Sequence, residues 1–239
     1  MIVKKIMYIN INIMEIVISI SPIHQTVYSF CSGYESDVCA DFAVTTTMSD
    51  IAFERGRSEQ QDVAEAYLET LAVYRKIAER MPGYDTILFH GSCVAVDGEG
   101  YLFTAKSGTG KSTHTALWRK LLADRAVMVN DDKPLLHINE NGSVIAYGTP
   151  WDGKHRLSNN IAVPLKAICI LERAEENDIE AITKQEAIPM LYQQAYRPMD
   201  TEAMQQTIAL IERLNVKFYW LGCNMDISAA ELSYHTMKG

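Results

Sequence analysis

Apolar and polar residues alternate near the start of the chain. From Ile9 to Ser21 the hydrophobic residues alternate, for the most part, with asparagine, glutamate and serine, which is the period of a half-buried strand. Lys4 and Lys5 precede this stretch as in a secretory signal, but the polar interruptions favour a strand over an export signal or a membrane helix. A second strand is expected at residues 41–47. Residues 1–57 are therefore predicted to form a small β-rich lead-in.

A helical period follows. Ser58, with Gln61 three residues later, has the pattern of a helix N-cap. Apolar residues then recur at helical spacing as far as Pro82 and Gly83, which stop the run; they are Val63, Tyr67, Leu71, Tyr74, Ala78 and Met81. We therefore expect a helix that begins after Ser58, and we place the start of the second domain, residues 58–239, at the same point.

Short apolar runs dominate the chain after residue 85. Two of them are joined by Asp97-Gly98-Glu99-Gly100, a pattern typical of a β-hairpin. The later strands are expected at 126–130, 135–138, 144–147, 162–173 and 217–221, and the helices at about 112–122, 184–196, 201–214 and near the C-terminus. Strands mixed with helices in this way predict an α/β fold.

Composition narrows the class of protein. The chain has 239 residues, 48% of them hydrophobic and 22% charged, and a net charge of -8, so it can bury a full core but has no general attraction for nucleic acid or anionic membranes. Its five cysteines form no C-x-x-C pair and no zinc-type spacing with histidine. Reduced thiols and a cytoplasmic location are the expectation.

A glycine-rich segment stands between the second hairpin strand and the helix near residue 112. The letters AKSGTGKS fit the pattern G-x-x-x-x-G-K-[ST] except at the first position, where Ala105 replaces glycine. Gly108 and Gly110 allow successive backbone N–H groups to point into one concavity, which forms an anion site with the helix N-terminus that follows. Lys111 is expected to reach the terminal phosphates of a nucleotide, and the Ser112 hydroxyl to ligate Mg²⁺. The alternative is a glycine-rich turn without a ligand.

A pair of carboxylates gives a second signal. The apolar strand AVMV leads directly to Asn130, Asp131 and Asp132, and an α/β fold places its ligands at such strand ends. A bound Mg²⁺-nucleotide needs a carboxylate ligand. A second carboxylate can then accept the proton of an attacking hydroxyl. The alternative is a turn or N-cap pair.

These residues carry a family resemblance. FHGSCVAVDGEGYLFTAKSGTGKSTHTALWRKLL followed by VMVNDDKPLL resembles the catalytic domain of HPr kinase/phosphorylase, in which a His-Gly strand, a hairpin, an S-G-x-G-K-S loop and a strand ending in Asp-Asp occur in that order. It also resembles the nucleotide site of phosphoenolpyruvate carboxykinase, which shares that core. The resemblance covers residues 89–136 well and extends more loosely to residue 171. It implies a carboxykinase-like P-loop core, with a mixed sheet, flanking helices and a phosphate loop fed by the hairpin.

The resemblance also implies roles for single residues. His90 is expected near the phosphates, Asp131 as the proton acceptor, and Asp132 as a ligand of Mg²⁺. The nucleotide-binding residues are expected to be Ser107, Gly108, Thr109, Gly110, Lys111, Ser112 and Thr113. Without the resemblance, His90 on an apolar strand would be interpreted as a core histidine.

One segment departs from the family pattern. HPr kinase/phosphorylase has a glutamate in a motif containing EIRG after its Asp pair, and nothing here matches it. The corresponding region is YGTPWDGKHRLSNN, residues 147–160, in which Asp152 is expected to supply the missing metal ligand. Lys154 and Arg156 are expected to hold the transferred phosphoryl group. A polar surface loop is the alternative.

The function expected from these features is phosphoryl transfer. The first 85 residues do not resemble the regulatory domain of full-length HPr kinase/phosphorylases, and carboxykinases are much longer, so the chain is more similar to short HPr-kinase-like proteins, some of which phosphorylate serine in ribosomally made peptides. We expect an ATP- and Mg²⁺-dependent kinase that acts on Ser or Thr of a small protein or peptide, with no nucleic-acid or membrane partner. A homo-oligomeric state stays open. A small-molecule kinase, a carboxykinase-like enzyme and a non-catalytic ATP-binding regulatory protein remain alternatives. The preference for ATP over GTP and a reverse phosphorylase reaction stay open.

Overall fold

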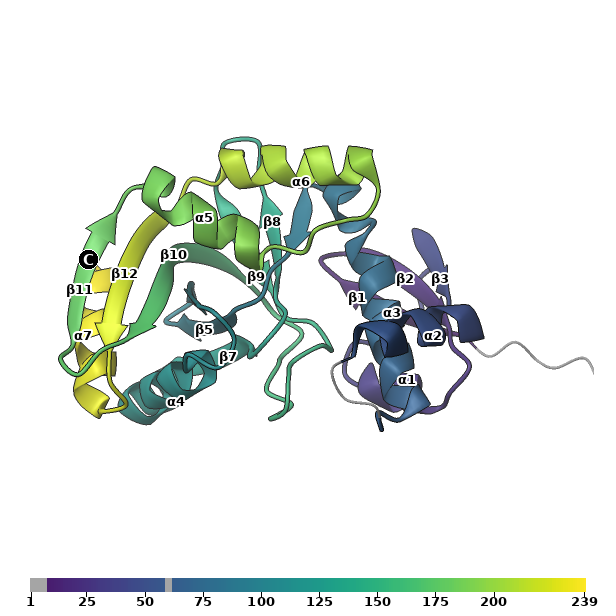
Figure 1. Cartoon of the computed structure of the whole chain (residues 1–239), viewed down its shortest axis with the longest axis horizontal. Helices are drawn as coiled ribbons and strands as arrows, with labels where there is room; N and C mark the ends of the chain where they lie inside the picture. The colour runs from purple at the N-terminus through teal and green to yellow at the C-terminus, as the bar shows by residue number, and fades with distance from the viewer. Residues whose placement is uncertain (1–7, 59–61) are drawn as a thin grey trace, which may run out of the picture. The chain divides into compact units, whose positions relative to one another are not determined.

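The chain divides into two compact units. The computed structural model describes residues 8–58 and 62–239, and the contacts separate Met1–Arg80 from Met81–Gly239 (Figure 1). The sequence pattern had placed a boundary at residues 57 and 58. In the structure the long helix that follows residue 58 belongs to the first unit.

The first unit contains a three-stranded sheet and three helices. The strands are β1 (Ile9–Ile13), β2 (Ile16–Ser21) and β3 (Phe42–Thr45), and the helices are α1 (Thr26–Phe30), α2 (Met48–Arg57) and α3 (Glu65–Ala78). The β1–β2 pair is antiparallel and the β2–β3 pair is parallel. The alternating run Ile9–Ser21 therefore forms two strands rather than one, because Met14 and Glu15 both have a φ of 64° and turn the chain back.

The predicted helix start at Ser58 is wrong. Ser58 is the C-cap residue of α2, which begins with a capping box between Thr47 and Asp50. Helix α3 begins at Glu65 instead, and Gln61 lies outside the described residues. The pattern from Ser58 fitted a cap, but the short helix α2 before it was not expected.

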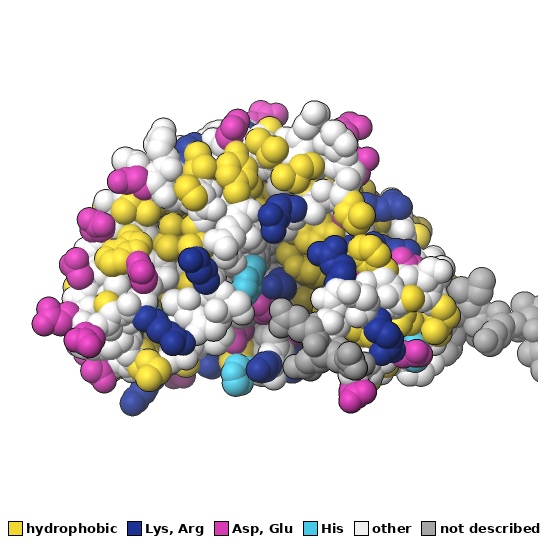
Figure 2. Space-filling model, viewed as in Figure 1, with side chains coloured by type: hydrophobic (Ala, Val, Ile, Leu, Met, Phe, Trp, Pro, Cys, Tyr) yellow, Lys and Arg dark blue, Asp and Glu magenta, His cyan; other side chains and the backbone are white. Residues whose placement is uncertain are grey.

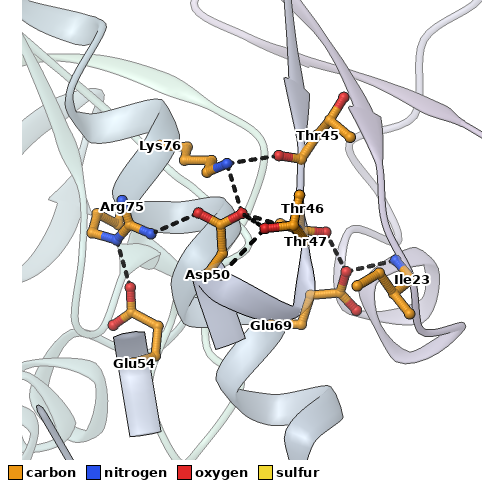
Figure 3. A network of polar contacts seen from close by, with 9 residues as sticks. All are labelled: Ile23, Thr45, Thr46, Thr47, Asp50, Glu54, Glu69, Arg75 and Lys76. Carbon is orange, nitrogen blue, oxygen red and sulfur yellow. Dashed lines mark hydrogen bonds and ion pairs between the residues drawn. The ribbon is translucent and has the colours of Figure 1, made fainter. Parts of the chain in front are cut away.

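Polar contacts tie the helices of the first unit to its sheet (Figure 3). Glu69 on α3 is fully buried and accepts hydrogen bonds from the backbone N–H groups of Ile23 and His24 and from the Thr46 hydroxyl. The His24 ring nitrogen Nδ1 also lies 2.8 Å from Glu69 Oε2. These contacts compensate the cost of burying the carboxylate, and they hold the pKa of Glu69 below its ordinary value against the effect of burial. The network thus stabilises the first unit.

The second unit is a curved mixed sheet between two layers of helices (Figure 1). Its strands are β4 (Thr86–Leu88), β5 (Ser92–Val96), β6 (Glu99–Thr104), β7 (Ala126–Asn130), β8 (Leu135–Ile138), β9 (Val144–Tyr147), β10 (Ala162–Arg173), β11 (Asp178–Ile182) and β12 (Lys217–Cys223), and its helices are α4 (Lys111–Leu122), α5 (Lys184–Gln194), α6 (Thr201–Arg213) and α7 (Ile227–Met237) with the short η1 (Met81–Tyr84) and η2 (Ala123–Arg125). The strand order is β4-β8-β9-β10-β6-β5-β7, with β12 also beside β10 and β11 beside β12. The mixed α/β class expected from the sequence is confirmed.

Two hydrophobic clusters cover the two faces of this sheet. Trp118 of α4 and Tyr234 of α7 pack with the Phe103 face of β6, whereas Leu191 of α5 and Ile211 of α6 pack on the other face. Burial of these side chains supplies the main favourable free energy of folding. The two clusters stabilise the sheet, and the sheet in turn anchors the ends of the loops at its edges.

Four strands of this sheet end at the same edge. β10 runs parallel to β6 and to β12, while β5 is antiparallel to both β6 and β7. The carboxyl ends of β6, β7, β10 and β12 therefore lie along one edge of the sheet. This is the edge at which the glycine-rich segment and the Asp131-Asp132 pair leave their strands.

Most elements of the second unit follow the expected pattern. The hairpin is confirmed, with its turn at Asp97 and Gly98, which have φ values of 52° and 86°. The strand β11 was not expected, because it is a largely exposed outer strand with little hydrophobic signal. Within the described part of the chain, no helix combines the length and the apolar character needed to cross a membrane.

Candidate functional site

The glycine-rich loop connects the end of β6 to the first residue of α4. Gly108 and Gly110 have φ values of 79° and 128°, and only glycine adopts such conformations without strain. A Cβ atom at either position would meet no atom within 4 Å. Glycine is therefore required here by the backbone conformation and not by close packing. The strand, the loop and the helix are confirmed as elements; phosphate binding stays a prediction.

Lys111 lies at the base of this loop. Only 8% of the residue is exposed, and its Nζ donates a hydrogen bond to the Ala105 carbonyl at 3.3 Å. Burial lowers the pKa of Lys111, while Asp132 and Asp131 favour its charged form. The predicted nucleotide-binding residues Ser107 and Thr113 are exposed on the loop and on α4.

Arg173 holds the outer side of the loop. It is the last residue of β10, and its guanidinium donates hydrogen bonds to the carbonyls of Gly108 and Thr109. These contacts fix two carbonyl groups on one side of the loop. The sequence analysis missed Arg173; the available signal was a basic residue at the end of a strand that runs parallel to β6.

Asp131 is held in a nearly closed position beside the loop. Only 5% of Asp131 is exposed, and its Oδ1 accepts a hydrogen bond from the Ser92 hydroxyl at 2.6 Å. Burial raises the pKa of the Asp131 carboxyl, although hydrogen bonds from Ser92 and Ser112 act in the opposite direction. Ser112 is the first hydroxyl on α4, so the contact joins the two predicted elements of the site.

Ser92 is a second residue that the sequence analysis missed. Its Oγ also lies 2.8 Å from Oγ1 of Thr115, one turn into α4. Ser92 and Thr115 are both buried, and they link the start of β5 to α4 and to Asp131. The signal was the serine of the HGS letters, two residues after the predicted site residue His90.

His90 and Asp132 lie next to each other and are more exposed to solvent than Asp131. His90 Nε2 is 3.4 Å from Asp132 Oδ1, and its Nδ1 is 2.7 Å from the Gln194 side-chain oxygen. Burial, together with the positive charges of Lys133 and Lys111, lowers the pKa of His90 to about 4. His90 is therefore a neutral hydrogen-bonding group at neutral pH. The structure places it beside Asp132 and within electrostatic reach of Lys111, and its contact with phosphate stays a prediction.

The segment from Tyr147 to Asn160 lies against this edge. The Asn130 side-chain amide donates hydrogen bonds to both oxygens of Thr149 at 3.0 Å. A Cβ atom added at Gly153 would come within 3.2 Å of the Asp132 Cβ. The segment is thus an ordered wall beside the carboxylate pair and not a remote surface loop.

Asp152 and Arg156 are engaged with each other within this segment. Arg156 lies 2.8 Å from Asp152 Oδ1 and donates a hydrogen bond to the Pro150 carbonyl, and the Ser158 hydroxyl donates to Asp152 Oδ2. Asp152 Oδ2 accepts a hydrogen bond, whereas its buried Oδ1 lies beside the Arg156 charge but accepts no hydrogen bond from the described residues. Metal binding by Asp152 stays a prediction, and Arg156 is tied to the turn. Lys154 is exposed on the same turn.

The residues at this edge fit a magnesium nucleotide better than a metal held by protein alone. Within residues 8–58 and 62–239, no three His, Cys, Asp or Glu side chains converge as a metal site. Mg²⁺ commonly takes one or two carboxylates and completes its shell with phosphate oxygens and water. Asp132, whose side chain is 33% exposed and whose Oδ1 lies 3.2 Å from Lys133 Nζ, and the Ser112 hydroxyl are the residues that could hold such an ion; binding of Mg²⁺ stays a prediction.

Comparison with known proteins places the chain in a family. The family model described as "SynChlorMet cassette protein ScmC" matches residues 57–218, more than half of the chain. The chain belongs to this family. The match includes the glycine loop, the carboxylate pair and the 147–160 segment. The family description names no activity.

A solved structure gives a more distant likeness. The HPr(Ser) kinase/phosphatase from Coxiella burnetii is 14% identical, and the match covers 64% of this chain and 99% of that one with a TM-score of 0.37. No curated protein matches the chain.

Proposed function

We propose that the second unit is an ATP- and Mg²⁺-dependent kinase that transfers the γ-phosphoryl group to a hydroxyl group of a small protein or peptide. The observation that carries the proposal is the hydrogen-bonded connection from the glycine loop to the carboxylate pair. Asp131 accepts a hydrogen bond from the Ser92 hydroxyl, which also lies 2.8 Å from the Thr115 hydroxyl of α4, and the Ser112 hydroxyl acts to lower the pKa of Asp131. A candidate phosphate-binding loop and a candidate base therefore lie at one sheet edge, which supports the proposal.

The loop would bind the phosphates of the nucleotide. Its backbone N–H groups and the N-terminus of α4 favour an anion, and Lys111 adds a positive charge at the base of the loop. The buried position of Lys111 strengthens its interaction with a phosphate, since the surroundings screen the charge less than water does. Mg²⁺, held by Ser112 and Asp132, would supply charge neutralisation at the terminal phosphates.

Asp131 would act as the proton acceptor. Burial raises the pKa of this carboxyl, and a base works best when its pKa approaches the operating pH. The hydrogen bond from Ser92 fixes the orientation of the carboxylate. An acceptor hydroxyl next to Asp131 would therefore be positioned for in-line attack as its proton is withdrawn.

The wall formed by residues 147–160 would face the acceptor. His155 and Lys154 are exposed on its turn, and the His155 side chain is among the groups that influence the pKa of Asp131. Arg156 forms an ion pair with Asp152, so we propose that it holds the 147–160 segment in its conformation and does not contact the phosphoryl group. Lys154 is the cation of this segment that we propose for contact with the transferred phosphoryl group.

The proposal is tested by incubating the protein with Mg²⁺, γ-labelled ATP and the peptides encoded beside its gene, followed by mass spectrometry. A serine or threonine that gains one phosphoryl group is the expected result. A matched incubation with an ATP analogue that cannot release its γ-phosphoryl group should give no labelled product. Tight ATP binding without transfer to any peptide or small alcohol would contradict the kinase assignment and favour a regulatory nucleotide-binding protein.

A further inference from the structure

A cavity of about 740 Å³ opens beside the glycine loop. Lys106 and Thr109 of the loop form one wall, and α5 and the strands β10, β11 and β12 form the others. Trp220 of β12 and Met190 of α5 give it apolar surface, and Glu180 of β11 gives it an exposed carboxylate. Figure 2 shows that hydrophobic side chains also reach the surface on the side that carries α5 and α6.

The strand order separates this cavity from the carboxylate pair. The glycine loop follows β6, the pair follows β7 on one side of it, and β10 and β12 lie on the other side. A triphosphate bound by the loop must direct its transferred end toward the carboxylates. The other end of the nucleotide then points toward β10, where the cavity opens.

Arg173 stands at the boundary between the loop and the cavity. It lines the cavity and donates hydrogen bonds to the carbonyls of Gly108 and Thr109. These bonds hold the loop backbone against the cavity wall. The cavity therefore adjoins the loop that is proposed to bind phosphate, with Lys106 and Thr109 of that loop in its wall.

We propose that this cavity holds the base and ribose of the nucleotide whose phosphates bind the glycine loop. The inference rests on the proposed function, and it adds a subsite on the other side of the loop. The volume lies in the range of pockets for small ligands. The indole of Trp220 offers apolar surface for a base, and the Glu180 carboxylate can accept hydrogen bonds from ribose hydroxyls.

The experiment compares the affinities of the whole protein for Mg·ATP and for Mg·tripolyphosphate, which has the phosphates but no nucleoside. We expect the wild type to bind Mg·ATP at least tenfold more tightly. Trp220→Leu keeps an apolar residue on β12 but removes the indole. This variant should lose roughly tenfold in affinity for Mg·ATP and bind Mg·tripolyphosphate as the wild type does.

A second pair of variants avoids the partly buried strand. Gln193 lines the cavity from α5, whereas Gln185 is exposed on the same helix and does not line it. Gln193→Trp should block the cavity and weaken Mg·ATP alone, and Gln185→Trp should change neither affinity. Equal affinities of the wild type for the two ligands, or an unchanged ratio in both Trp220→Leu and Gln193→Trp, would overturn the subsite and leave the proposed function standing. Failure of the wild type to bind either ligand would overturn the proposed function and the subsite with it.

Discussion

Asp131 is the residue on which binding and chemistry should separate. It is buried, it is oriented by the Ser92 hydroxyl, and its charge also acts on Lys111 at the base of the glycine loop. Asp131→Asn keeps the shape of the side chain and removes the base. We expect Mg·ATP affinity to remain within a few-fold of the wild type while transfer falls by roughly 10²-fold or more, the usual scale for loss of a general base.

The measurement is single-turnover transfer beside equilibrium binding. Asp132→Asn is the comparison variant, and because it removes a proposed Mg²⁺ ligand, it should raise the Mg²⁺ concentration that half-maximal transfer requires. Full transfer activity in Asp131→Asn would move the role of base away from this residue.

His114 gives a residue-scale prediction for stability. It is buried on α4 against the Phe103 ring, and burial lowers its pKa to about 4. Between that value and the ordinary value near 6.5, the unfolded chain binds more protons than the folded one, so stability must fall as pH falls. The contribution of this group approaches about 1.4 kcal/mol per pH unit.

Denaturant unfolding of the wild type and of His114→Gln between pH 7 and pH 4.5 checks this prediction. The variant should show a shallower loss of stability on acidification, with the remaining slope coming in part from His90, whose pKa is lowered in the same direction. His235→Gln, an exposed change on α7, should leave the slope unaltered. Parallel pH profiles for the wild type and His114→Gln would show that His114 takes up a proton inside the fold.

At the scale of elements, Gly148 determines how the 147–160 segment meets the sheet. A Cβ atom there would lie 1.9 Å from the Asn159 carbonyl oxygen and 2.6 Å from that of Val129, and neither backbone group can move away cheaply. We expect Gly148→Ala to lower the free energy of unfolding by about 2 kcal/mol or more, the range of overpacked sites. Gly83→Ala, which meets no atom within 4 Å, is the matched control and should be close to neutral in denaturant unfolding. An undiminished midpoint in Gly148→Ala would mean that the segment is not packed against β7.

The helices and strands near the site were predictable from the sequence. The hairpin, the helix after the glycine loop and the strand before Asp131 each combine a clear hydrophobic period with turn residues such as Asp97 and Gly98. The elements of the first unit were less predictable. The turn at Met14 and Glu15 lacks the glycine or asparagine that normally marks a hairpin, and Ser58 follows a helix instead of starting one.

For the molecule as a whole, the sequence predicted that the candidate site residues lie at one edge of the sheet. It did not predict the residues that hydrogen-bond to them. Asp131, Asp132, His90 and Lys111 follow from motifs in one stretch of chain. Ser92, Thr115 and Arg173 contact Asp131, one another or the glycine loop only because of the order and register of the strands. A single sequence does not reveal that order and register. Acidic side chains are spread along the rim of the second unit (Figure 2), and the whole chain has a net charge of -8. The positive charge of Lys111 is therefore a local feature of the site.

The central claim is that the glycine loop binds a magnesium nucleotide through Lys111. A ligand that binds only the native state raises the melting temperature, so the direct measurement is the thermal shift with saturating Mg·ATP in the wild type, in Lys111→Ala and in Lys120→Ala, an exposed lysine on the same helix. We predict a clear rise of several degrees in the wild type and in Lys120→Ala, and little or none in Lys111→Ala at the same ligand concentration. Equal shifts in all three proteins, or no shift in the wild type, would contradict the account.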